Sequence, residues 1–137
     1  MPKILVIEDE KHISRLIEIT LQREGHEIEK AFDGVEGLEK VESFKPDLII
    51  LDRMMPRMDG MEVMRNLQSN VTTADIPVIF LTAKAQDADV FDGWSSGASC
   101  YLTKPFNPNE LKLFVNRVIT TSTLDYEGYE TEEIHEI

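Results

Sequence analysis

The sequence predicts an α/β fold in which helices cover both faces of a parallel β-sheet. Short apolar runs alternate with segments of helical spacing five times along the chain. The inner runs are apolar at nearly every position, which is typical of parallel strands buried on both faces. Right-handed crossovers and short connections leave few arrangements of such units. We therefore expect a flavodoxin-like (βα)5 three-layer sandwich with strand order 2-1-3-4-5.

The expected strands differ in polarity, and this difference supports their order. They cover residues 3–7, 26–32, 47–52, 77–82 and 99–104. The second run, HEIEKAF, is the most polar of them. The predicted order places this strand at an edge of the sheet, where polar and charged side chains are common.

Apolar stripes and capping residues predict the helices between these strands. The first covers residues 11–24 and ends at Gly25. Its expected buried stripe consists of Ile13, Leu16, Ile17 and Leu21. The second covers residues 34–44, after an Asp33-Gly34 turn. Its expected stripe consists of Val35, Leu38, Val41 and Phe44.

The remaining helices follow from the same signals. Asp59 can cap a third helix over residues 60–69, and Asn107 or Asn109 can cap a last one ending at about Ile119. The pattern of a fourth helix, over 86–96, is weakened by Gly93. In all, the chain is predicted to alternate strand and helix from end to end.

Length and charge limit the function classes. The 137 residues suit one domain, which we place at residues 1–120. The net charge of −12 argues against direct nucleic-acid binding, which needs a basic face. The sequence has neither a membrane-spanning apolar run nor a signal peptide, so a cytoplasmic protein without membrane contact is expected. Residues 121–137 are expected to form an acidic tail or the start of a linker.

Polar side chains follow four of the five expected strands. Glu8-Asp9-Glu10 comes after the first, Asp52 ends the third, Thr82 ends the fourth, and Lys104-Pro105 follows the fifth. Because the carboxyl ends of parallel strands meet at one edge of a sheet, these residues should lie close together. The first and third strands are neighbours at the switch point of this topology, where ligands bind.

The expected cluster combines carboxylates, a hydroxyl and an ammonium group. Oxygen ligands suit a hard divalent ion such as Mg²⁺, and Lys104 can pair with an anion. Together these groups fit phosphoryl transfer, with Asp52 as the nucleophile. Each residue alone has an ordinary alternative, such as a turn, a cap or a loop. Complementary residues after four strands favour a phosphate-handling site.

Four stretches of the chain resemble the receiver domain of bacterial two-component response regulators, in particular the chemotaxis-regulator type. They read ILVIEDE, LIILDRMMPRMDG, VIFLTA and GASCYLTKPF, and the resemblance covers about residues 3–120. It implies that Asp52 accepts a phosphoryl group from a histidine of a sensor kinase or of a histidine phosphotransfer protein. Thr82 and Lys104 would contact the phosphoryl oxygens, and Tyr101 would be the aromatic switch residue with Thr82.

The same resemblance implies a metal site beside the phosphoacceptor. Asp9 and Asp52 would bind Mg²⁺, with Mn²⁺ as an alternative ion, and Glu8 would act through water. Met54 would contribute its backbone carbonyl rather than its side chain. The bond between Lys104 and Pro105 is commonly cis in this family.

The sequence therefore predicts a phosphorylation-dependent switch that has no external substrate beyond its own phosphorylation and dephosphorylation. A single-domain regulator is favoured, acting on a protein partner through a face made by helix 4, strand 5 and helix 5. One alternative is the receiver part of a longer regulator with an effector domain. Another is a phosphohydrolase with an aspartate nucleophile, which generally needs a second acid where this chain has Met54. A flavodoxin-like cofactor binder is disfavoured because the loop EDEKH lacks a phosphate cradle.

Overall fold

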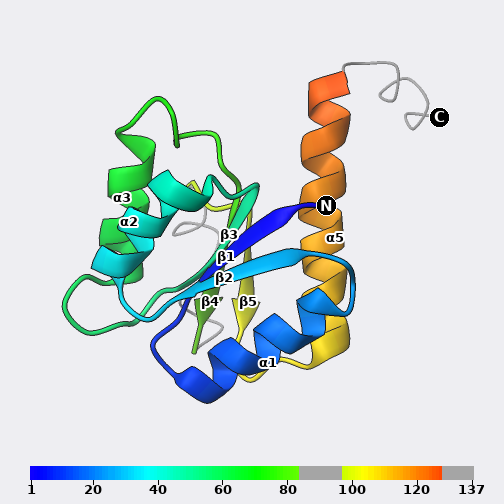
Figure 1. Cartoon of the computed structure of the whole chain (residues 1–137), viewed down its shortest axis with the longest axis horizontal. Coiled ribbons are helices and arrows are strands. Elements are labelled where there is room, and N and C mark those ends of the chain that lie inside the picture. Colours follow the sequence, from blue (N-terminus) through cyan, green and yellow to red (C-terminus); the bar gives the residue numbers. More distant parts are fainter. Residues whose placement is uncertain (84–96, 128–137) are drawn as a thin grey trace.

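Five parallel strands form the centre of the molecule and confirm the predicted order 2-1-3-4-5 (Figure 1). They are β1 (Lys3–Ile7), β2 (Glu27–Ala31), β3 (Leu48–Asp52), β4 (Val78–Thr82) and β5 (Cys100–Thr103). This computed structural model describes residues 1–83 and 97–127, with side chains through Thr121. The most polar strand, β2, lies at an edge as expected.

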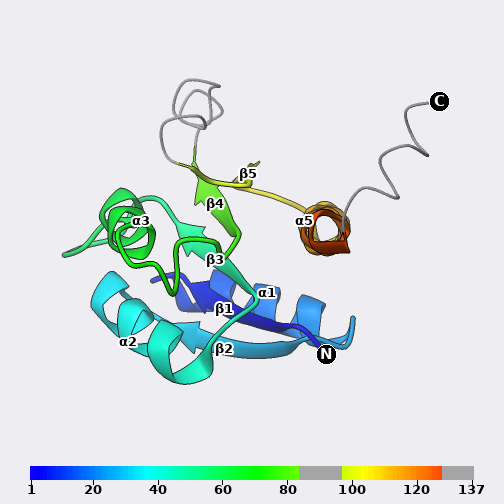
Figure 2. The ribbon, with the colours of Figure 1, turned by 90° about the horizontal axis from the view of Figure 1, so that it is seen from above.

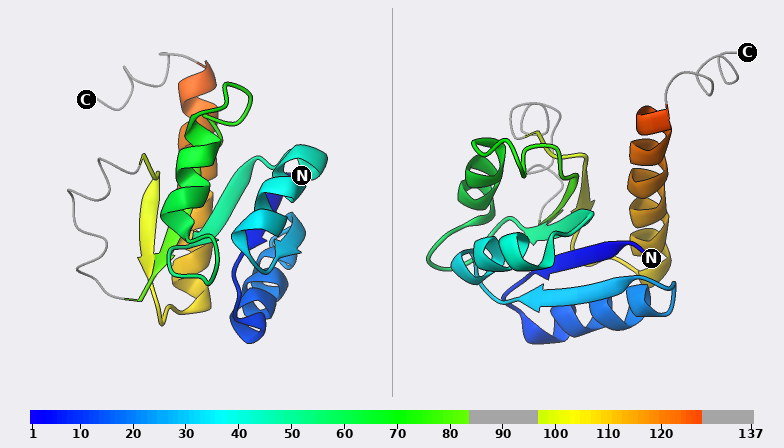
Figure 3. Two further views of the ribbon diagram at one scale, coloured as in Figure 1. Left: turned by 90° about the vertical axis from the view of Figure 1, so that its left-hand side faces the viewer. Right: turned by 45° about the horizontal axis from the view of Figure 1, so that its top comes forward.

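Helices cover both faces of the sheet and complete three layers. They are α1 (Lys11–Gln22), α2 (Gly34–Phe44), α3 (Gly60–Gln68) and α5 (Pro108–Glu127). Figure 2 shows α1 and α5 on one face and α2 and α3 on the other, and Figure 3 shows the same layering from two further sides. The helix expected over 86–96 lies outside the described residues.

Alternation along the strands divides the core into two clusters. In β1, Ile4 and Val6 pack in the cluster with α1 and α5, whereas Leu5 and Ile7 pack in the cluster with α2 and α3. Every residue of β3 and β4 is buried, because helices cover both of their faces. The two clusters hold the central strands in place and therefore fix the positions of their carboxyl ends.

Three helices begin at side chains that cap them. Asp33 Oδ1 accepts a hydrogen bond from the backbone nitrogen of Glu36 at 2.9 Å at the start of α2. Asp59 caps α3 as predicted, and at α5 the cap is Asn107 rather than Asn109. Such side chains satisfy backbone donors that have no partner within the helix.

Three details of the helices were predicted wrongly. Leu16 and Val35 were expected in buried stripes, but their side chains are 41% and 48% exposed. Helical spacing does not give the width of the buried stripe, and both residues lie just outside it on their amphipathic helices. The last helix runs through Glu127 rather than ending near Ile119.

The outer strand β2 carries charged side chains that form ion pairs with its flanking helices. Glu27 and Glu29 are exposed. Lys30 lies 2.9 Å from Glu18 of α1, and Lys40 of α2 lies 3.5 Å from Glu29. The strand is therefore bordered by ion pairs on both faces of the sheet. Separately, none of the described helices has the length and apolar character needed to cross a membrane.

Candidate functional site

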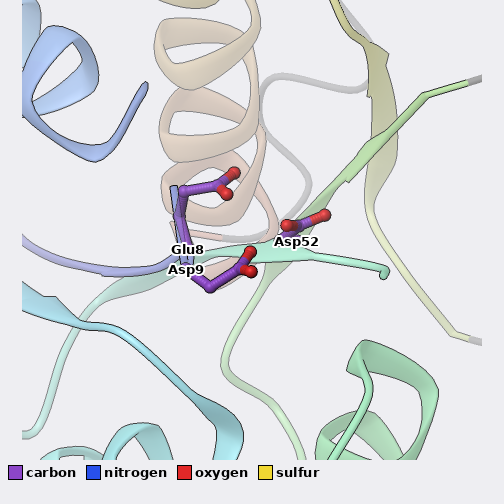
Figure 4. Close-up of side chains that lie close together, drawn as sticks. All are labelled: Glu8, Asp9 and Asp52. Carbon is purple, nitrogen blue, oxygen red and sulfur yellow. The ribbon is translucent and has the colours of Figure 1, made fainter. Parts of the chain in front are cut away.

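Three carboxylates meet where β1 and β3 end. Glu8 and Asp9 follow β1, and Asp52 is the last residue of β3 (Figure 4). One carboxylate oxygen of each lies within 4.8 Å of one from each of the others. Glu8 is fully buried, and Asp52 is only 3% exposed. Strand pairing between β1 and β3 produces this cluster, as the parallel topology predicted.

Lys104 lies against this cluster from the end of β5. Its Nζ is 3.0 Å from Glu8 Oε1 and 3.3 Å from Asp52 Oδ2. Its backbone nitrogen donates to the carbonyl oxygen of Thr82 at 2.7 Å, which ties the chain after β5 to the end of β4. The Lys104–Pro105 bond is cis, as the resemblance implied. The predicted ammonium group is thus in direct contact with two of the predicted acids.

Burial and crowding shift the proton affinities of the central pair. Burial, the negative charge of Glu8 and a hydrogen bond with Glu8 raise the pKa of Asp52 to about 7, against the opposing effect of Lys104. Burial disfavours the charge of Lys104, but its hydrogen bonds and ion pairs with Glu8 and Asp52 prevail, so its pKa is raised. The cluster therefore contains more negative charge than Lys104 alone can neutralise.

The donor set of this cluster fits a hard divalent cation. Its ligands are carboxylate oxygens from Glu8, Asp9 and Asp52, which Mg²⁺ and Ca²⁺ prefer to nitrogen or sulfur. The raised pKa of Asp52 points the same way, because a cation would stabilise its anionic form. Among the described residues, no other such group of three or more histidine, cysteine or acidic side chains occurs.

Thr82 and Tyr101 lie on β4 and β5, the two strands that follow β3 in the sheet order. Thr82 is fully buried at the end of β4, one strand away from Asp52. Tyr101 is half-buried on β5, with its ring 5.5 Å from that of Phe80 in a stacked arrangement. It packs on the face of the sheet covered by α2 and α3. Thr82 is therefore on the strand next to Asp52, whereas Tyr101 is one strand further away, beyond β4.

The loop after β3 turns back across the end of the strand. The backbone nitrogen of Met54 donates to Asp52 Oδ1 at 3.2 Å, while the Met54 side chain is 68% exposed. Met55 and Met64 are buried in the α2–α3 cluster. Met55 and Met64 therefore pack in the core, whereas the side chain of Met54 is largely exposed to solvent.

Gly60 allows α3 to start directly against this loop. A Cβ atom at this position would lie 2.5 Å from the carbonyl oxygen of Asp52 and 2.7 Å from the Cα of Arg53. Since both atoms belong to the backbone, a larger residue must displace the loop. We expect Gly60→Ala to lower the free energy of unfolding by roughly 1–3 kcal/mol. Urea unfolding measures this, and an unchanged midpoint would contradict the close approach.

Two contacts at this edge were not predicted from the sequence. Glu10 Oε1 lies 3.5 Å from Lys104 Nζ, so a third acid shares the ammonium group. Arg57 forms an ion pair with Asp33, which links the loop after β3 to the start of α2. Glu10 stands in the same acidic run as Glu8, which was the available clue. The Arg57 contact depends on a backbone with φ of 68°, which sequence spacing does not indicate.

Comparison with known proteins agrees with this geometry. The response regulator receiver domain family matches residues 4–116. The chain is 45% identical over 111 residues to the DNA-binding dual master transcriptional regulator RpaA of Synechocystis, covering 81% of this chain and 46% of that protein. It is 41% identical over 122 residues to the alkaline phosphatase synthesis transcriptional regulatory protein PhoP of Bacillus subtilis, covering 89% and 50%. The chain thus spans about half the length of these curated relatives.

A solved structure of similar length supports the same assignment. The chemotaxis protein CheY4 of Vibrio cholerae superposes with a TM-score of 0.81 at 35% identity, covering 86% of this chain and 98% of that one. Fold, acidic cluster and sequence therefore agree, and the predicted resemblance is confirmed. The chain belongs to the response regulator receiver domain family and is a phosphorylation-dependent signalling domain.

Proposed function

We propose that Asp52 is the phosphoacceptor of this receiver domain and that the donor is a phosphohistidine of a sensor kinase or of a histidine phosphotransfer protein. The observation that carries the proposal is the position of its carboxylate. Asp52 is buried at the end of β3, within reach of Lys104 and of two further acids. A buried carboxylate beside an ammonium group and two further acids is typical of a reactive group. This environment suits a nucleophile better than a residue that only ends a strand.

The transfer requires one bond to form and one to break. A carboxylate oxygen of Asp52 attacks phosphorus while the bond to the donor's imidazole nitrogen breaks, and that nitrogen keeps the electron pair. The Lys104 ammonium, 3.3 Å from Asp52 Oδ2, is placed to neutralise charge on the transferred group. The hydroxyl of Thr82 supplies a further donor at the same edge. Attack of water on phosphorus then breaks the bond to the Asp52 oxygen, which releases inorganic phosphate and restores the carboxylate; no external substrate is turned over.

We propose that the divalent cation is Mg²⁺ or alternatively Mn²⁺. Its proposed ligands are Glu8, Asp9, Asp52 and the backbone carbonyl of Met54. When bound, it neutralises charge on the carboxylates and on the phosphoryl oxygens. Full burial favours Glu8 as a group that orients the site, while the half-buried Asp9 is better placed for direct ligation. Their oxygens, with that of Asp52, lie within 4.8 Å of one another.

The proposed switch runs from Asp52 toward β5. A phosphoryl group adds negative charge and acceptor oxygens, which attract the hydroxyl of Thr82. Displacement of Thr82 gives Tyr101 space to move from its half-buried position against Phe80. Phosphorylation would thus shift the populations of two arrangements of the sheet edge at β5.

The output surface is proposed to include β5 and α5. A hollow of about 370 Å³ lies there, and its lining includes Tyr101, Phe114 and Arg117. Burial raises the pKa of Cys100, at the same hollow, to about 11, so its thiol is a packing group. The helix 4 part of the predicted face falls outside the described residues. A protein partner docking here is favoured by the mixed apolar and polar lining of the hollow and by the presence of Tyr101 in it.

A second mode of output is favoured by the lengths of the relatives. RpaA and PhoP are about twice as long as the matched region, and RpaA is named as a DNA-binding transcriptional regulator. A receiver domain working with a DNA-binding effector is therefore the alternative to direct protein contacts. The prediction that nucleic acid is not bound rests on the charge of this domain alone and stays a prediction, as does the cytoplasmic location.

Chemical trapping tests the phosphoacceptor directly. The protein is incubated with acetyl phosphate and Mg²⁺, reduced with borohydride, digested and analysed by mass spectrometry. Reduction converts an aspartyl phosphate to homoserine, so the expected product is homoserine at position 52. A chelator in a parallel sample should suppress it. Homoserine at another acid, or trapping unaffected by the chelator, would contradict the proposal, and steady turnover of a phosphomonoester would favour the phosphohydrolase.

A further inference from the structure

Glu10 is the N-cap residue of α1, yet its side chain does not cap the helix. Its backbone is extended, as N-cap residues are, but no hydrogen bond from a helix nitrogen reaches its carboxylate. Serine, threonine, aspartate or asparagine would supply such a bond. Glu10 Oε1 instead lies 3.5 Å from Lys104 Nζ, across the site from its own helix. The start of α1 therefore has no side-chain cap from Glu10, because this side chain contacts Lys104 instead.

Lys104 is surrounded by as many carboxylates as it has protons to donate. Glu8 Oε1 lies at 3.0 Å, Asp52 Oδ2 at 3.3 Å and Glu10 Oε1 at 3.5 Å from its Nζ. An ammonium group has three donors. The side chains of Glu8 and Asp52 are nearly or fully buried, but that of Glu10 is 49% exposed. The contact with Glu10 is the longest and the most hydrated, so it is the one most easily exchanged.

The backbone of Glu10 also belongs to this network. Its nitrogen donates to Glu8 Oε2 at 3.0 Å, while the other oxygen of Glu8 faces Lys104. Glu8 therefore contacts both the backbone of Glu10 and the ammonium group of Lys104, which places the start of α1 beside Lys104.

We propose that Glu10 is a positioning residue that competes with the phosphoryl group for Lys104. When a phosphoryl group on Asp52 draws further donors of Lys104 toward its oxygens, the long and exposed contact with Glu10 is the one given up first. The contact between Glu10 and Lys104 is then broken. Its loss offsets part of the favourable free energy of the new contact between Lys104 and the phosphoryl group. Glu10 thus weakens the hold of the site on a phosphoryl group. This inference rests on the proposed role of Asp52 as phosphoacceptor.

Binding of beryllium trifluoride, a phosphoryl mimic, tests the competition at saturating Mg²⁺. We compare the full chain with Glu10→Gln, which removes the charge, and Glu10→Ser, which removes it and adds a helix cap. Both variants should bind the mimic about two- to fivefold more tightly, the range expected for losing a partly exposed ion pair. Only Glu10→Ser should also unfold at higher urea concentration.

Glu39→Gln is the matched control, because Glu39 is exposed on α2 and its replacement changes net charge equally. It should leave the affinity for the mimic unchanged. Equal affinity of the wild type and Glu10→Gln overturns the inference, as does tightening by Glu10→Ser alone, which would assign the effect to the helix start. Equal tightening by Glu39→Gln would assign it to net charge. If the wild type does not bind the mimic, the phosphoacceptor role itself fails.

Discussion

Asp52→Asn is expected to abolish phosphoryl incorporation completely. An amide oxygen cannot form a stable acyl phosphate, and the neighbouring acids are not equivalent nucleophiles. Glu8 Oε1 is engaged 3.0 Å from Lys104, and Asp9 lies in the loop after β1 rather than at the end of β3. Intact mass spectrometry after incubation with acetyl phosphate and Mg²⁺ measures the result. The wild type should gain the mass of one phosphoryl group and the variant none.

Asp75→Asn is the control for this substitution. Asp75 is exposed and lies outside the acidic cluster, so the variant makes the same chemical change away from the site. It should be phosphorylated as fast as the wild type. Equal labelling of Asp52→Asn and the wild type would show that phosphate is accepted elsewhere and would remove the basis of the proposed mechanism.

Asp52→Asn is also expected to stabilise the metal-free protein at neutral and alkaline pH. The pKa of Asp52 is raised from 3.8 to about 7 by burial and by Glu8. The folded state therefore holds a proton that the unfolded state has already lost, so stability falls as pH rises from about 4 to 7. Asparagine does not ionise. Its advantage should grow across this window and level off above it, at roughly 2–4 kcal/mol.

Urea unfolding at a series of pH values, with a chelator present, measures this advantage. Mg²⁺ should reduce it, because a cation bound to the wild-type cluster removes much of the cost of ionising Asp52. Asp75→Asn should show no comparable pH-dependent gain. A constant difference between Asp52→Asn and the wild type from pH 4 to 8 would mean that Asp52 ionises normally in the folded state.

The sequence was sufficient to predict the sheet and the central site, because both depend on a simple rule. Buried strands such as Leu48–Asp52 are continuous apolar runs, and parallel pairing brings their ends together. The inferred order placed Glu8 and Asp52 on adjacent strands, with Lys104 at the same edge of the sheet. The contacts of Lys104 with both acids span β4 and depend on the reach of its side chain.

Details that depend on a single conformation were not predictable in the same way. Leu16 has the spacing of a buried residue, but the width of the covered stripe on α1 leaves it 41% exposed. Nothing in the spacing indicates that Glu10 reaches Lys104 instead of capping its own helix. The end of α5 was also misplaced, because the chain beyond Ile119 contains no glycine or proline before Gly128 to end a helix.

The charged side chains along β2 bear on how copies of this domain can meet. A free strand edge is a template on which another chain can extend the sheet. At this edge an approaching copy would have to desolvate the exposed Glu27 and Glu29 and disturb the ion pair between Lys30 and Glu18. The charged side chains of β2 therefore disfavour extension of the sheet at this edge by a second copy of the domain.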